Sequence, residues 1–84
     1  MSENRRDLSL KYRIKAILLR RYPDDQERAA IIQQLSSRLN VSPNHLRKMT
    51  NYTQGSPNEV RLSQLKIIAD FLGVSPESLV ISYE

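Results

Sequence analysis

A short polar stretch, Asn44 to Asn51, concentrates the side chains that could do chemistry in this 84-residue chain. Its predicted outward positions carry amides, an imidazole, a guanidinium and an amine: Asn44, His45, Arg47, Lys48 and Asn51. Asn and Arg form paired hydrogen bonds with adenine and guanine edges, and Lys contacts bases or phosphates. No Asp or Glu occurs between Glu27 and Glu59, so no carboxylate in this region repels phosphate. The stretch predicts DNA recognition; the plainer alternative is a solvated helix with ordinary polar residues.

Catalytic chemistry has few candidates in the rest of the chain. The sequence contains one histidine, no cysteine and two glycines. It therefore lacks a Gly-rich phosphate-binding loop and the ligand spacing of a metal site. Asp24 and Asp25 are adjacent at a predicted helix start, where capping explains them better than acid–base catalysis. We expect no enzymatic activity, no cofactor, no metal and no small-molecule substrate.

The polar stretch must be positioned by two helices, which are predicted from their apolar spacing. Leu35 and Leu39 lie four residues apart and share one face of the first helix. Leu46 and Met49 lie three apart and form the buried face of the second. The second helix, predicted over 43–52, therefore turns its polar residues outward.

The turn between these helices has its own local signals. Asn40 suits the left-handed conformation that ends many helices. Val41 is apolar and can fill the angle between the two helices. Ser42 can cap the next helix with its hydroxyl, and Pro43 suits the first helical position. Together these features predict a helix-turn-helix.

The N-terminal part of the chain allows two interpretations. Residues 1–7 are polar and predict a flexible arm. The apolar residues after this arm fit a helical stripe with spacings of three and four: Leu10, Ile14, Ile17, Leu18 and Tyr22. Over 8–14, however, apolar and polar residues alternate strictly, as in a strand. We predict a helix over about 9–21, stopped by Pro23, with a short strand over 8–14 as the alternative.

The C-terminal part predicts a loop over 52–61 and closing helices and a tail over 62–84. The apolar stripe of the first closing helix is Leu62, Leu65, Ile68, Ala69 and Leu72. This helix should end at Gly73, and a short final helix should begin at Ser75.

One eight-residue pattern occurs twice, at 39–46 and, 33 residues later, at 72–79. Two copies are too few for a solenoid, so the repeat predicts two helix–helix joints with similar caps. The second copy carries Glu77, and no basic residue occurs after it. Charge therefore assigns DNA contact to the first copy and closure of the core to the second.

Length and composition restrict the class of protein. The chain is long enough for one domain, 1–84, with a small core around the helix-turn-helix at 24–51. It has no apolar segment that predicts a transmembrane helix or a signal peptide. A net charge of +4 and the absence of cysteine fit a cytoplasmic, nucleoid-associated protein.

The segment 35–51, with the later run Ile68-Ala69-Asp70-Phe71-Leu72-Gly73-Val74-Ser75, resembles the lambda repressor and Cro family of helix-turn-helix domains. The resemblance covers about 30–80. It implies an all-α, compact five-helix bundle, possibly with a short terminal strand. It also implies sequence-specific binding to double-stranded DNA, usually as a dimer, in transcriptional control of a repressor-like kind.

Matched to the family pattern and to the predicted outward face, two groups of residues are candidate contacts. The candidate base contacts are Asn44, His45, Arg47 and Asn51. The candidate phosphate contacts are Gln33, Arg38, Ser42, Lys48, Tyr52 and Arg61.

The sequence departs from the family at three residues and in the length of one loop. Ile32, with Gln33 beside it, stands where the family usually has a phosphate-binding Gln. Ser36 replaces a small Ala and Asn40 replaces a Gly, and the loop over 49–62 is a few residues longer than the family norm. These departures leave a second hypothesis, a protein–protein interaction module that kept the bundle and lost DNA binding.

A homodimer is expected through the apolar end of the chain. Its candidate residues are Leu79, Val80, Ile81 and Tyr83. They would pack across a two-fold axis, or pair as a strand with a second copy or with the segment 8–12. The alternative is that they cover the core of their own chain.

Overall fold

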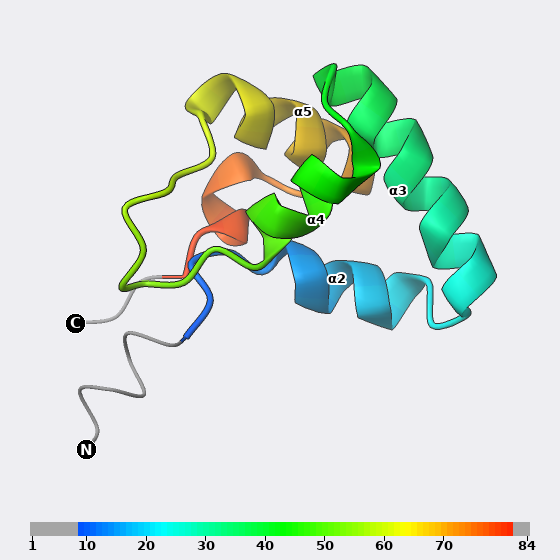
Figure 1. The fold of residues 1–84 in the computed structure, drawn as a ribbon, viewed down its shortest axis with the longest axis horizontal. Coiled ribbons are helices and arrows are strands. Elements are labelled where there is room, and N and C mark those ends of the chain that lie inside the picture. The colour runs from blue at the N-terminus through cyan, green and yellow to red at the C-terminus, as the bar shows by residue number, and fades with distance from the viewer. Residues whose placement is uncertain (1–8, 82–84) are drawn as a thin grey trace.

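The computed structural model describes residues 9–81, which form a compact arrangement of helices (Figure 1). The elements are α2 (Ile14–Arg21), α3 (Asp25–Leu39), α4 (Pro43–Thr50), α5 (Leu62–Leu72) and the 3-10 helix η1 (Pro76–Leu79). The predicted all-α class is confirmed. The predicted five-helix count is wrong for this part of the chain, which has four α-helices, because the last segment forms a single 3-10 turn.

The predicted start and end of α3 are confirmed in detail. The Asp24 carboxylate caps the helix by accepting a hydrogen bond from the Glu27 N–H, with Oδ2 2.9 Å from the nitrogen. At the other end Asn40 is left-handed, with φ 58° and ψ 43°, and it is the one non-glycine residue of positive φ among the described residues. Both ends therefore form from local side-chain chemistry.

Helix α4 is also capped as predicted, but it is shorter than predicted. The Ser42 hydroxyl accepts the His45 N–H at 3.1 Å, and Pro43 occupies the first helical position. The predicted helix over 43–52 instead ends at Thr50. It stops there because the Thr50 hydroxyl and the Asn51 amide both donate to the Arg47 carbonyl oxygen, at 2.7 and 2.9 Å.

Residues 9–13 are not helical, so the predicted helix over 9–21 is wrong in its first third. Leu10 forms an isolated antiparallel bridge with Thr53, and Tyr12 forms another with Val80. The Lys11 N–H donates to the Tyr52 carbonyl and the Arg13 N–H to the Leu79 carbonyl, each at 2.8 Å. Extended partners on both sides thus stabilise an extended segment, as the alternative prediction anticipated, although no complete strand forms within 9–81.

The core lies where the helices meet. Its composition differs from the prediction in the stripe of α5 and in the proposed dimer surface. Leu62, predicted to belong to the buried stripe of this helix, is 63% exposed, whereas Val60, in the loop, is 5% exposed. The Val60 N–H donates to the Tyr12 hydroxyl at 2.9 Å, which holds the loop against the core. Leu79 is completely buried, so this dimer candidate covers its own core instead. Its neighbour Val80 is 44% exposed.

Two expectations lie outside the described residues: the flexible arm 1–7 and the dimer candidate Tyr83. Within 9–81, none of the helices combines the length and apolar character needed to cross a membrane.

Candidate nucleic-acid interface

The outward face of α4 presents side chains that are free to contact a ligand. Asn44, His45, Arg47 and Lys48 are all exposed. None of these four side chains makes a hydrogen bond or an ion pair with another described residue. All four side chains can donate hydrogen bonds, and Arg47 and Lys48 carry positive charge. The face therefore has unused donors and no carboxylate beside it.

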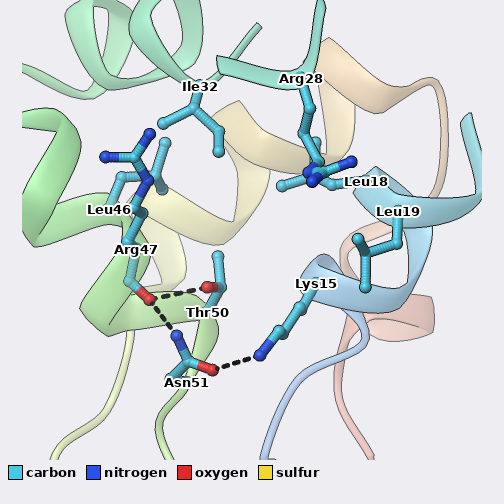
Figure 2. Close-up of a pocket in the computed structure, with 9 residues that line it drawn as sticks. All are labelled: Lys15, Leu18, Leu19, Arg28, Ile32, Leu46, Arg47, Thr50 and Asn51. Carbon is cyan, nitrogen blue, oxygen red and sulfur yellow. Dashed lines mark hydrogen bonds between the residues drawn. The ribbon is translucent and has the colours of Figure 1, made fainter. Parts of the chain in front are cut away.

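Asn51, the fourth predicted base contact, is held differently. Its amide nitrogen donates to the Arg47 carbonyl, and its amide oxygen accepts a hydrogen bond from Lys15 Nζ at 2.9 Å. Figure 2 shows Lys15 reaching from α2 to Asn51 at the end of α4. These two bonds use one acceptor position and one N–H of the Asn51 amide, so a base contact would have to share the amide with Lys15 and Arg47. In this structure Asn51 joins α4 to α2.

The predicted phosphate contacts do not form one cluster. Gln33 is exposed on α3, and Ser42 and Lys48 are exposed at the start and in the last turn of α4. The guanidinium of Arg38 instead lies over the ring of Phe71 on α5, 5.0 Å from its centroid. Arg38 is thus placed between α3 and α5 by a cation–π contact.

The two remaining candidates flank the loop between α4 and α5. Tyr52 is half-buried and packs against the core, and its carbonyl accepts the Lys11 N–H. Arg61 is exposed at the N-cap of α5, where its N–H donates to Gln64 Oε1 at 3.0 Å. Of these two candidates, only Arg61 is exposed.

The residues that position this loop were missed from the sequence. Lys11 Nζ donates to the carbonyl oxygens of Ser56 and Asn58, at 2.7 and 2.6 Å. The Gln54 amide nitrogen donates to the carbonyls of Leu10 and Ile81, at 3.1 and 3.2 Å. These partners are 27 to 47 residues apart, so no local pattern could indicate them. Lys11 therefore has a structural role, because its side chain fixes the loop by bonding to two of its backbone carbonyls.

A pocket of about 210 Å³ adjoins the outward face of α4, between α2, α3 and α4 (Figure 2). Its apolar walls include Leu18 and Ile32, and Arg47 lies at its edge. On the α3 side Arg28 is paired with Asp25 and also donates to the Tyr22 carbonyl. No group of His, Asp or Glu residues within 9–81 is arranged to hold a metal ion.

The chain was compared with models of protein families, with curated proteins and with solved structures, and none of them matches it. The function proposed below therefore depends on the residues and geometry of this chain alone.

Proposed function

We propose that this protein binds double-stranded DNA sequence-specifically, as a transcriptional regulator of the lambda repressor and Cro type of helix-turn-helix bundle. In this proposal α4 enters the major groove, and its outward side chains contact base edges. The major groove of B-DNA is about 12 Å wide and admits one α-helix. A nucleoid-associated location and a repressor-like role belong to the same proposal.

One observation supports this proposal above all others: α4 is packed into the core along one face, and polar side chains on its other face make no hydrogen bonds within the described residues. Leu46 and Met49 are at most 1% exposed, so they fix the rotation of the helix. That rotation leaves the side chains of Asn44 and Arg47 exposed, and neither side chain has a hydrogen-bond partner among the described residues. Arg pairs with guanine and Asn with adenine through two hydrogen bonds each, which suits them to base recognition.

Fewer residues are proposed to contact phosphate than the sequence predicted. Lys48 and Ser42 lie on α4 itself, and Gln33 is the exposed amide next to Ile32 on α3. Arg61 would contact the backbone from the far end of the loop. Arg38 contributes charge only from a distance, because its guanidinium stacks on Phe71.

The test is selection of bound duplexes from a random library, and then titration of the best duplex against salt. Each phosphate that a Lys or Arg neutralises should contribute a slope of about −0.9 in log affinity against log salt concentration. We expect one enriched sequence motif and a slope of about −2 or steeper, since Lys48 and Arg61 are the two cations among these phosphate contacts. An unenriched library would contradict sequence-specific binding, and a flat slope would contradict DNA binding altogether.

The second candidate, a protein–protein interaction module on the same bundle, is favoured by a different observation. Four large apolar side chains outside α4 are exposed among the described residues: Leu19 at 45%, Leu62 at 63%, Ile67 at 38% and Val80 at 44%. Ile32, where a phosphate-binding Gln would stand in the related family, is 9% exposed and belongs to the core. Such a module would show no salt-dependent affinity for any duplex.

A homodimer remains part of the proposal, but fewer residues are available to form its interface. Of the candidate residues, Val80 is exposed and Ile81 is half-buried, whereas Leu79 is inside the core. Two half-sites about 34 Å apart would double the length of DNA that is recognised. The mass of the protein in solution, with and without the selected duplex, tests this. A Val80→Glu variant should remain monomeric, and its unchanged association would exclude this surface.

A further inference from the structure

The pocket between α2, α3 and α4 combines apolar walls with a cationic edge. Leu18, Leu19 and Ile32 supply apolar surface, and Lys15, Arg28 and Arg47 supply positive charge (Figure 2). No Asp or Glu lines it. We propose that this pocket binds a small aromatic carboxylate, with the ring against the leucine and isoleucine side chains and the carboxylate on Arg47.

The size of the pocket restricts the ligand to a single ring. An apolar protein cavity of about 150 Å³ holds one benzene molecule. The volume of about 210 Å³ found here leaves room for one ring and one carboxylate group. A fused two-ring acid would protrude into solvent, which the open mouth of the pocket allows but which adds little buried apolar area.

Part of the apolar wall of the pocket is exposed to solvent. Leu18 is 3% exposed and Ile32 is 9% exposed, yet Leu19, which also lines the pocket, is 45% exposed. A ring seated in the pocket would cover the Leu19 side chain as well. Burial of apolar surface on both sides of the ring is the main source of affinity for such a ligand.

The three cationic side chains differ in how many of their hydrogen-bond donors are available to a ligand. The Arg28 guanidinium is already engaged by Asp25 and by the Tyr22 carbonyl. Lys15 Nζ donates to the Asn51 amide oxygen at 2.9 Å and has further donors. The Arg47 guanidinium has no partner among the described residues. Arg47 is therefore the group that can take a carboxylate through two parallel hydrogen bonds, with Lys15 adding attraction.

Occupation of the pocket has a regulatory consequence, which rests on the proposed function. Arg47 cannot bind the carboxylate and a guanine edge at the same time. The ligand should therefore weaken binding to the selected duplex, and the duplex should weaken binding of the ligand equally.

The experiment titrates the full chain, without DNA, with benzoate at constant pH and ionic strength while amide resonances are recorded by NMR. We expect saturable shifts centred on Leu19, Ile32 and Arg47. Benzyl alcohol, a neutral ligand of similar size, should bind about tenfold more weakly because it lacks the charge-assisted bonds. The Arg47→Gln variant should lose benzoate affinity by about the same factor. Leu19→Gln should also weaken binding, because it removes part of the apolar wall.

Lys66→Gln is the control variant, since it removes one positive charge from an exposed site on α5, outside the pocket. It should leave benzoate affinity unchanged. A dispersed spectrum shows that each variant is folded. Equal affinity for benzyl alcohol, unsaturable shifts, or shifts centred on Arg13 and Arg20 on the other flank of α2 would overturn the proposal. If the protein binds a selected duplex but not benzoate, only the ligand proposal is wrong. If it binds benzoate but selects no duplex, only the DNA-binding proposal is wrong.

Discussion

The same eight-residue pattern joins helices twice, at 39–46 between α3 and α4 and at 72–79 between α5 and η1. Each copy begins with a buried leucine and a left-handed residue, Asn40 with φ 58° and Gly73 with φ 70°. Each continues with a valine whose N–H donates to the carbonyl five residues earlier, at 3.0 Å in the first copy and 2.9 Å in the second. Each ends in a leucine that is completely buried.

The two copies differ in the segment on the C-terminal side of the turn. In the first, the Ser42 hydroxyl accepts a backbone N–H and α4 continues to Thr50. In the second, the Ser75 side chain caps no N–H and η1 ends at Leu79. The Leu79 carbonyl accepts the Arg13 N–H, and the chain then extends along residues 11–13. One joint therefore presents a helix to solvent, and the other returns the chain to its own core. A shared sequence pattern therefore does not by itself determine whether the segment after the turn continues as an exposed helix.

The largest expected effect tests whether the closing leucines of the two joints are equivalent. Leu46→Ala and Leu79→Ala should each lower the free energy of unfolding by about 2–5 kcal/mol, because both side chains are completely buried. Urea titration measures this. Val80→Ala, at a 44% exposed position, is the control and should change stability by less than about 0.5 kcal/mol. If the Leu79→Ala variant were as stable as the control, Leu79 would not be buried in its own core, and a dimer contact through Leu79 would again be a valid hypothesis.

The next effect tests whether only the first joint contacts DNA. Arg47→Ala should weaken binding to the selected duplex by about 1–3 kcal/mol and weaken binding to random DNA much less. Glu77→Ala, which changes the charge of the second joint, should alter either affinity by less than about 0.5 kcal/mol. Equal losses for Arg47→Ala on both kinds of DNA would make it a phosphate contact.

A third effect tests the left-handed residue that both joints share. Asn40→Gly should be tolerated, whereas Asn40→Val should lower stability by more than about 1 kcal/mol, because a β-branched residue disfavours positive φ. Gly73→Ala should cost about 1–2 kcal/mol through backbone strain. A Cβ added at Gly73 would meet no atom within 4 Å, so steric overlap does not contribute there. Thermal unfolding measures all three, and a harmless valine at position 40 would contradict the observed turn.

The smallest effect addresses the feature in which the joints differ. Ser42→Ala should lower stability by about 1 kcal/mol, because it leaves the His45 N–H without its capping acceptor. Ser75→Ala should change stability by less than about 0.5 kcal/mol, because the Ser75 side chain caps no N–H. Similar losses in both variants would mean that the hydroxyl does not explain why α4 continues and η1 stops.

Features that depend on residues three or four apart were predictable from the sequence alone. The Asp24 and Ser42 caps and the left-handed Asn40 form where the pattern placed them. The all-α class and the buried positions of Leu46 and Met49 result from helical spacing in the same way. Such features need no distant partner, because each side chain bonds or buries within its own turn.

The candidate site was predictable only in part. The exposure of Asn44 and Arg47 could be inferred from their spacing relative to Leu46. The Lys15 bond to Asn51, the placement of Arg38 over Phe71 and the pocket beside α4 could not, since their members come from different helices.

The tertiary structure also decided the conformation of residues that had two local options. The segment 9–13 has both helical and strand periodicity, and the extended form is adopted because backbone partners at 52–54 and 79–81 are available on either side. Val60 is buried and Leu62 exposed because the Tyr12 hydroxyl holds the loop at Val60. Hydrogen bonds between segments more than 40 residues apart can outweigh helical spacing, and a local pattern contains no information about them.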